Sequence, residues 1–303
     1  MLLGSSSSAD DVLRGRDLSG QRVLITGVSA GVGAATARAI LDQGGTVLGA
    51  VRNIDKARIA LGMSEGRQDF HRLELIELDL ASLESVRSCA IELRRRAKPF
   101  DVMICNAGIM AVPEGSTVDG FETQLGTNYV GHFVLVNELH TLFAPAGRLV
   151  VLSSAGHRGA DVGPGDLQPE SGTYDPLTAY RRSKTALILM AVEFDRRHRH
   201  RGIRATAVHP GAVLTETAQK LVDAQPEAAS RFSWKSPAQG AATSVWAAFV
   251  ADADEIGGRY CEDCHVADVN DDPRSSEGVR SYAMDPKRAH ELWEATESLT
   301  PAH

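Results

Sequence analysis

Short apolar runs alternate with longer amphipathic stretches along most of this chain. An apolar run of strand length predicts a buried strand, and apolar positions three or four apart predict one face of a helix. The predicted strands are Arg22–Thr26, Thr46–Val51, Leu73–Leu78, Asp101–Cys105, Arg148–Leu152 and Ile203–Val208. The predicted helices are Val32–Gln43 and residues 54–61, 82–97, 117–143 and 177–201, with a last helix from Pro286 that has Asp285 as its N-cap.

The alternation of strands and helices predicts one parallel sheet with helices on both faces. We therefore expect an α/β fold with a single doubly wound parallel sheet and a C-terminal extension. Residues 1–18 are rich in Ser and Asp, and their apolar residues follow neither the strand pattern nor the helix pattern. They are therefore predicted to form a flexible N-terminal arm. Residues 19–303 are predicted to form a single domain.

Composition and charge narrow the classes of function. The 303 residues carry 32 Lys and Arg against 39 Asp and Glu, a formal net charge of −7. Such a chain is a poor candidate for binding nucleic acid or an anionic membrane. It contains neither an apolar stretch of membrane-spanning length nor a secretory signal pattern, and its four cysteines suggest a reducing compartment. These features predict a cytoplasmic globular protein with no nucleic-acid or membrane partner.

A glycine-rich turn links the first predicted strand to the first long helix. It reads Thr26-Gly27-Val28-Ser29-Ala30-Gly31-Val32-Gly33, with the spacing Gly-x-x-x-Gly-x-Gly. Such a turn lets backbone N–H groups approach a pyrophosphate at the helix N-terminus, where the helix dipole favours negative charge. The turn therefore predicts a dinucleotide-binding domain.

Over about residues 20–260 the sequence resembles the short-chain dehydrogenase/reductase family. The motifs that carry the resemblance follow the family's order: the glycine turn, Asp79-Leu80, Asn106-Ala107-Gly108, Asn128, Ser153-Ser154, Tyr180-x-x-x-Lys184 and Pro210-Gly211. Cys105 departs from the pattern, since many members have Asn there. The resemblance implies a Rossmann-type sheet and an NAD(P)-dependent oxidoreductase acting on CH–OH groups, as a homodimer or homotetramer. The long stretch between Ser154 and Tyr180, and Gly126–Phe133, point to the retinol-dehydrogenase-like branch.

The end of the second strand bears on the choice of cofactor. Enzymes of this architecture that use NAD usually carry a carboxylate there, bonded to the ribose 2′-hydroxyl. This chain has Arg52 and Asn53 instead, and its first carboxylate is Asp55. A guanidinium suits a 2′-phosphate and Asn53 can add a hydrogen bond, so NADP(H) is the predicted cofactor and NAD(H) the alternative.

The family resemblance also implies a set of cofactor-binding residues around these two sites. They are Gly27, Ser29, Ala30, Gly31, Val32, Gly33, Asp79, Leu80, Asn106, Ala107, Gly108, Tyr180, Lys184, Pro210, Gly211, Val213 and Thr215.

Tyr180 and Lys184 are the strongest catalytic candidates. With five Tyr and six Lys, this spacing should arise by chance only about 0.1 times. Residues four apart share a helix face, and a nearby ammonium is expected to lower the pKa of a phenol. Tyr180 is thus the predicted acid/base and Ser154 the predicted partner of the substrate oxygen, with Ser153 the alternative. The resemblance implies that Lys184 also holds the nicotinamide ribose and that Asn128 connects it to a water relay.

Other functions remain as alternatives. A serine hydrolase would need a Gly-x-Ser-x-Gly elbow, which neither Ser153 nor Ser154 has, although His157 lies nearby. A silent dinucleotide sensor would have no need of Tyr180 and Lys184. Cys261-Glu-Asp-Cys264-His265 matches a haem-attachment pattern but lacks the export signal and a second ligand pair. We interpret these cysteines as ordinary thiols and predict no metal site.

Two segments are predicted to form the substrate side, at about residues 157–178 and 212–236. The second contains Leu221, Val222, Phe232 and Trp234 among polar residues. Such segments cover substrates in this fold; the alternative is that these apolar residues pack down as an ordinary surface helix. The predicted partner is a small, largely apolar ketone, aldehyde or alcohol. The sequence as a whole predicts an oxidoreductase that interconverts carbonyl and alcohol by hydride transfer.

Overall fold

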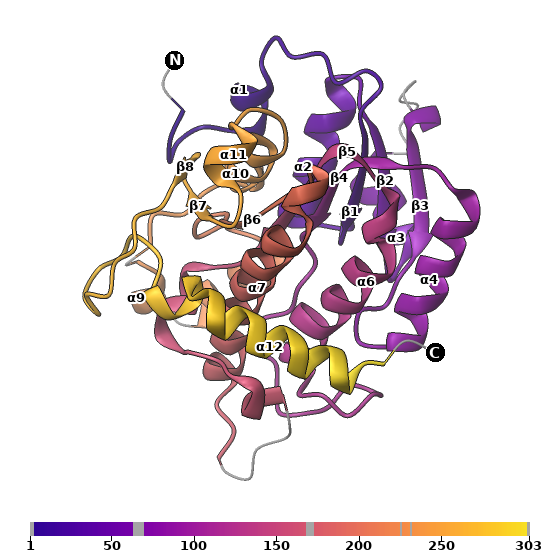
Figure 1. The fold of residues 1–303 in the computed structure, drawn as a ribbon. Coiled ribbons are helices and arrows are strands. Elements are labelled where there is room, and N and C mark those ends of the chain that lie inside the picture. The colour runs from indigo at the N-terminus through magenta and orange to yellow at the C-terminus, as the bar shows by residue number, and fades with distance from the viewer. Residues whose placement is uncertain (1–2, 63–69, 168–172, 225, 231, 302–303) are drawn as a thin grey trace.

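The computed structural model describes residues 3–62, 70–167, 173–224, 226–230 and 232–301. Their strands form an eight-stranded sheet in the order β3-β2-β1-β4-β5-β6-β7-β8 (Figure 1). All neighbouring strands are parallel except β7 and β8. The strands are β1 (Arg22–Thr26), β2 (Thr46–Val51), β3 (Leu73–Glu77), β4 (Phe100–Cys105), β5 (Phe143–Leu152), β6 (Arg204–His209), β7 (Tyr260–Glu262) and β8 (His265–Val266). The predicted doubly wound sheet is confirmed.

Helices cover both faces of this sheet. They are α1 (Ala9–Leu13), α2 (Gly31–Asp42), α3 (Ile54–Ala60), α4 (Leu83–Arg96), α5 (Thr123–Leu125), α6 (Gly131–Leu139), α7 (Pro176–His198), α8 (Glu216–Ala224), α9 (Pro226–Ala229), α10 (Pro237–Phe249), α11 (Ala253–Ile256) and α12 (Pro286–Leu299). Ser82 caps α4 and Asp285 caps α12 through their side chains, as the sequence predicts. These caps satisfy N–H groups that a helix leaves without intrahelical partners.

Two hydrophobic clusters hold the layers together. Successive strand residues point to opposite faces, so Leu24 belongs to one cluster while Val23 and Ile25 belong to the other. The first cluster joins the sheet to α4, α6, α7 and α12, and the second joins it to α1, α2 and α10. Figure 1 shows α12 lying across α7. There Trp293 packs edge-on against Phe133 of α6, with ring centroids 4.7 Å apart.

The N-terminal segment is not the flexible arm that the sequence predicts, at least over residues 3–18. Ser8 and Asp11 form a reciprocal capping box at the start of α1. Val12 and Leu13 are buried, and α1 packs against α10 and α2. The sequence reading failed because a helix of five residues is too short to display a period, although its apolar residues are enough to dock it.

The predicted helix 117–143 is also broken up. Thr117 and Phe121 close a turn through their backbone, and helical structure begins only with α5. A π-helical turn over Gly126–Val130 then leads into α6, which ends at Leu139. Strand β5 begins at Phe143, where its ring packs on Phe100 of β4, rather than at Arg148.

The sheet order determines where a site can form. β1 lies between β2 and β4, so the chain crosses to opposite sides of β1 at this point. In open parallel sheets, ligands bind at the carboxyl ends of the strands at such a switch point. The ends of β1, β4, β5 and β6 carry the glycine turn, Asn106, Ser154 and Pro210 respectively. In the part of the chain described here, no helix is long and apolar enough to cross a membrane.

Candidate functional site

The glycine turn leaves a backbone cradle at the start of α2. Gly27 has φ +76°, and a Cβ there would lie 2.8 Å from Cβ of Ala107. A Cβ on Gly33 would lie 2.2 Å from the carbonyl oxygen of Gly27. Only glycine fits either position. The N-cap residue Ala30 offers no side-chain hydrogen bond, so the first N–H groups of this helix stay free for an anion. These residues fit the pyrophosphate of a dinucleotide.

A buried hydrogen-bond network joins the ends of β1 and β4 beneath the cradle. Oγ1 of Thr26 accepts the backbone N–H groups of Asn106 and Ala107, both at 3.0 Å. Nδ2 of Asn106 donates to the carbonyl of Thr26 at 2.9 Å, and Nε2 of His132 lies 2.9 Å from Oγ1 of Thr26. Burial lowers the pKa of His132 to about 4. The Asn106 side chain thus fixes the glycine turn from below.

The residues at the end of β2 are arranged around the start of α3. The Arg52 side chain is exposed, and among the described residues no carboxylate pairs with it. Oδ1 of Asn53 accepts the N–H of Lys56 at 2.8 Å and so caps α3. Asp55, the nearest carboxylate in sequence, pairs with Arg58 at 3.0 Å. Arg52 is therefore a cation at this strand end with no acidic partner among the described residues.

The other residues expected at the cofactor fall into two groups. Gly108 lies beside the catalytic candidates, since a Cβ there would be 3.2 Å from Oδ1 of Asn128 and 3.5 Å from Nζ of Lys184. Thr215 lies against the glycine turn, its methyl 3.1 Å from the Cβ position of Gly31. The side chains of Val32 and Val213 instead pack on Gly240 of α10, and their carbonyls accept hydrogen bonds from Thr36 and Thr215 respectively.

Asp79, Leu80, Pro210 and Gly211 lie at the carboxyl ends of their strands. Oδ1 of Asp79 accepts the N–H of Ala81 at 3.0 Å, and Leu80 is buried. Pro210 follows β6, and Gly211 takes φ +86°.

Tyr180, Lys184, Ser154 and Asn128 converge at the ends of β4 and β5. Nζ of Lys184 lies 5.6 Å from the centroid of the Tyr180 ring and donates to the carbonyl of Leu152 at 2.9 Å. The Ser154 side chain is hydrogen-bonded to Tyr180. Nδ2 of Asn128 donates to Oγ of Ser183, which in turn donates to the carbonyl of Tyr180. Helix α7 therefore presents its catalytic candidates to the strand ends.

Burial governs the ionisation of this pair. It raises the pKa of Tyr180, which the hydrogen bond with Ser154 partly offsets, and it lowers the pKa of Lys184 to about 8. From the sequence, the Lys184 ammonium is expected to lower the pKa of the phenol. In the structure desolvation has the larger effect, so that expectation is corrected.

The two adjacent serines have different surroundings. Oγ of Ser153 is buried and donates to the carbonyl of Lys184 at 2.7 Å, so it ties α7 to β5. Oγ of Ser154 accepts the N–H of Gly156 at 3.0 Å and faces Tyr180. Of the two, Ser154 has the geometry to reach a substrate oxygen.

Sequence reasoning missed Gln124, which lies four residues before Asn128. Its Oε1 accepts the N–H of Ala111 at 2.8 Å, and its Nε2 donates to the hydroxyl of Tyr174 at 3.0 Å. Asn128 bonds both the N–H and the carbonyl of Ile109. The two amides therefore clamp the segment after β4 and anchor the residues before α7. Their spacing of four was the available signal.

The first predicted substrate segment, 157–178, packs in part against the body of the protein. Val162 and Leu167 are buried, and residues 164–167 pack against α12. Residues 168–172 lie outside the described part of the chain.

The second predicted substrate segment, 212–236, is joined at its ends. Val213 pairs with Lys235 in a parallel bridge, while Leu214 and Phe232 are exposed. Residues 225 and 231, and the side chain of Leu221, lie outside the description.

Cys261 and Cys264 are both buried, and desolvation raises the pKa of each thiol, to about 12 and about 11. Within the described residues, no group of three or more His, Cys, Asp or Glu could hold a metal ion. Thiols of such high pKa are poor nucleophiles and poor ligands.

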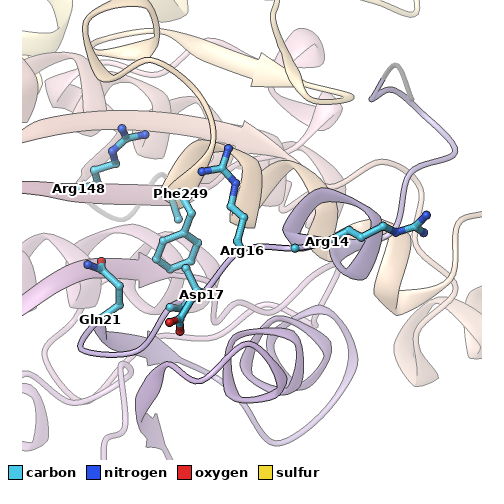
Figure 2. Close-up of a pocket in the computed structure, with 9 residues that line it drawn as sticks. Arg14, Arg16, Asp17, Gln21, Arg148 and Phe249 are labelled. Atoms are coloured by element: carbon cyan, nitrogen blue, oxygen red, sulfur yellow. The ribbon is translucent and has the colours of Figure 1, made fainter.

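A hollow of about 690 Å³ lies near the amino end of β1, away from the strand ends that carry the glycine turn and Ser154. It is bounded by the segment after α1, Gln21 before β1, Arg148 of β5 and Phe249 at the end of α10. Figure 2 shows Arg14 directed away from Phe249. Nη1 of Arg148 already donates to the carbonyls of Ala247 and Ala251. This hollow is therefore separate from the site around Tyr180.

Comparisons with known proteins agree with this geometry. The short chain dehydrogenase family matches residues 21–226. The chain is 38% identical to "Short-chain dehydrogenase/reductase prx1" of Penicillium roqueforti, over 95% of this chain and 88% of the relative. An uncharacterised protein from Mycobacterium paratuberculosis has a crystal structure that matches with TM-score 0.75 and 33% identity, over 97% of both chains.

A short chain dehydrogenase from Burkholderia cenocepacia, crystallised in complex with NADP, matches with TM-score 0.63 and 25% identity. That match covers 82% of this chain and 97% of the other. Fold, motif order and sequence identity all lead to one assignment. The chain belongs to the short-chain dehydrogenase/reductase family of oxidoreductases.

Proposed function

We propose that this protein is an NADP(H)-dependent oxidoreductase that interconverts a ketone or aldehyde and the matching alcohol. The observation that carries the proposal is the convergence of Tyr180, Ser154 and Lys184 beside Gly108, next to the glycine cradle. A proton donor, an oxygen-binding hydroxyl and a cation within one small site suit the reduction of a carbonyl. When bound, a nicotinamide cofactor would supply or accept the hydride.

Each residue of the proposed site has a separate role. Tyr180 donates a proton to the carbonyl oxygen in reduction and takes one from the hydroxyl in oxidation. Ser154 hydrogen-bonds the same oxygen and orients it toward the phenol. Lys184 holds its positive charge near the phenol, and Asn128 keeps α7 in register with the segment after β4. Burial raises the pKa of Tyr180, so the phenol retains the proton that it donates in the reductive direction.

The preference for NADP(H) rests on the end of β2. Arg52 is exposed there and Asp55, the nearest carboxylate in sequence, is paired with Arg58, so a 2′-phosphate would meet the Arg52 cation. The relative from Burkholderia cenocepacia was crystallised in complex with NADP, which supports the same choice. The exposed Leu214 and Phe232 in the segment 212–236 favour a largely apolar substrate.

The test is a pair of matched assays with the purified protein. NADPH consumption is followed with a panel of ketones and aldehydes, and NADP⁺ reduction with the corresponding alcohols. Turnover in both directions on one carbonyl–alcohol pair is expected. NADPH binding without turnover on any member of the panel would favour the silent sensor. A haem absorption band or stoichiometric metal would favour a redox centre at Cys261 and Cys264.

A further inference from the structure

The turn that carries Ser154 lies between two histidine side chains. Nδ1 of His157 lies 2.7 Å from the carbonyl oxygen of Ser154, and Nδ1 of His209, at the end of β6, accepts the N–H of Ala155 at 3.2 Å. His157 is fully buried and His209 is partly buried. The backbone on both sides of the Ser154–Ala155 peptide bond is thus held by an imidazole.

The hydrogen bonds determine which nitrogen of His157 carries the proton. Nε2 of His157 accepts the backbone N–H of Arg280 at 3.2 Å, so it has no hydrogen. The proton must then be on Nδ1, which donates it to the carbonyl of Ser154. Nδ1 of His209 is likewise unprotonated, because it accepts an N–H. Both hydrogen bonds require neutral rings.

Residues 278–282 of the C-terminal extension form hydrogen bonds with His157 and Arg158. The hydroxyl of Tyr282 donates to the carbonyl of His157 at 2.6 Å. Arg158 donates to the carbonyl of Gly278 at 2.8 Å and pairs with the buried carboxylate of Glu262 at 2.9 Å. That carboxylate also accepts the N–H of Gly278 at 2.7 Å. The turn is therefore fixed to residues 278–282 as well as to the sheet.

We propose that His157 and His209 are positioning residues, which hold the Ser154 hydroxyl in the direction of Tyr180. This role rests on the proposed carbonyl–alcohol chemistry. Oγ of Ser154 accepts the N–H of Gly156, and this leaves its own hydrogen available to Tyr180 or a substrate oxygen. Rotation of the Ser154–Ala155 peptide would shift the backbone that follows it, including the N–H of Gly156 that holds this hydroxyl oxygen.

The geometry argues against a proton-transfer role for His157. Both ring nitrogens are engaged with backbone groups, of Ser154 and Arg280, and neither has a hydrogen bond with the side chain of Ser154 or Tyr180. The ring acts on the reaction only through the backbone of the serine.

The experiment compares His157→Leu with His157→Asn, whose amide can replace the Nδ1–H donor, in kcat and in KM for NADPH. We expect the Leu variant to lose about tenfold or more in kcat, as a misplaced reacting group does, with KM for NADPH unchanged. The Asn variant should recover most of that loss. His200→Leu, which changes an exposed histidine, is the control and should behave as the wild type.

A double-mutant cycle gives the decisive result. In a Ser154→Ala background, His157→Leu should cause little further loss, because its effect passes through Ser154. If the loss in kcat of the double variant equals the product of the losses in the two single variants, the positioning role is overturned while the proposed function stands. If the wild type turns over no carbonyl, the proposed function fails and this role fails with it. If His157→Leu does not fold, His209→Leu and His209→Asn take the place of the two His157 variants. They are compared in kcat, and His209→Leu is combined with Ser154→Ala, with the same expected and contrary results.

Discussion

Removing the Tyr180 hydroxyl tests the acid/base assignment with little disturbance to the fold. Tyr180→Phe keeps the ring but removes the proton donor, so turnover should fall by about 10²–10⁴, the range for loss of a general acid/base. NADPH affinity should stay near the wild-type value, because the cradle and Arg52 are unchanged. Steady-state rates and a fluorescence titration with NADPH measure the two quantities. Retention of more than about a tenth of turnover would mean that another group moves the proton.

Arg52 should determine the choice between the two cofactors. Arg52→Ala is expected to weaken NADPH binding by about 1.5–3 kcal/mol, the usual contribution of a charged hydrogen bond, and to leave NADH binding almost unchanged. Arg199→Ala, which removes an exposed arginine at the end of α7 and leaves Asp55 paired with Arg58, is the matched control and should alter neither affinity. Calorimetric titration with both cofactors measures the difference. Equal losses for NADPH and NADH would contradict the assignment.

The ionisation of Lys184 should set the alkaline limit of carbonyl reduction. Burial lowers its pKa to about 8, so the ammonium is present below that pH and is lost as the pH rises through it. kcat/KM for NADPH, which reports ionisations of the free enzyme, should therefore decline above about pH 8. In Lys184→Arg the guanidinium keeps its proton, and the decline should move to higher pH. A flat wild-type profile from pH 7 to pH 10 would show that the charge of Lys184 is not needed.

At the scale of elements, α1 should contribute measurably to stability. Leu13 is fully buried where α1 meets its neighbours, so Leu13→Ala should reduce the free energy of unfolding by about 2–5 kcal/mol. Ile59→Ala, at a side chain that is 72% exposed, should change it little. Urea unfolding of both variants provides the comparison. If the two variants are equally stable, the docking of α1 does not stabilise the protein.

Elements with a strong local pattern could be predicted from the sequence. β1 and β2 have the predicted bounds, since each is a continuous apolar run between turn residues. β7 and β8 were not predicted because they span three and two residues, too few to show a pattern. The break between Thr117 and α5 was missed because it depends on a turn within a sequence of helical appearance.

In the candidate site, too, residues within one element could be predicted from the sequence, and contacts between distant segments could not. Tyr180 and Lys184 could be found because one helix carries both at a fixed spacing. Gln124 and His209 act through backbone groups far away in sequence, and only the folded chain brings them there. The raised pKa of Tyr180 was missed for a similar reason, since burial follows from packing and not from the neighbouring residues.

At the scale of the whole molecule, neutral histidines should make the protein sensitive to acid. Burial lowers the pKa to about 4 for His132 and His157 and to about 3 for His209. The unfolded chain takes up these protons near pH 6.5 and the native state does not, so stability falls with pH below that value. Each such histidine can contribute up to about 1.4 kcal/mol per pH unit.

Unfolding free energies in urea at pH 7.5 and pH 5.0 test this expectation. The loss between them should be at least about 2 kcal/mol, and His157→Asn should show a smaller loss because one titrating group is gone. Equal stability at the two pH values would mean that these histidines are protonated in the native state as readily as in the unfolded one.

The backbone bridge between Val213 and Lys235 has a consequence for how this protein could diversify. The N–H of Leu214 bonds the carbonyl of Lys235 at 2.9 Å, and the N–H of Lys235 bonds the carbonyl of Ala212 at 2.8 Å. The two ends of this stretch are therefore held side by side, and the entropy of closing a loop depends only weakly on its length. We therefore expect that residues can be added, removed or exchanged beyond Thr215 without displacing the strand ends. Under the proposed function, we expect an exchange of residues 216–234 for those of a relative to change the substrate preference and to leave Tyr180, Lys184 and Ser154 in place.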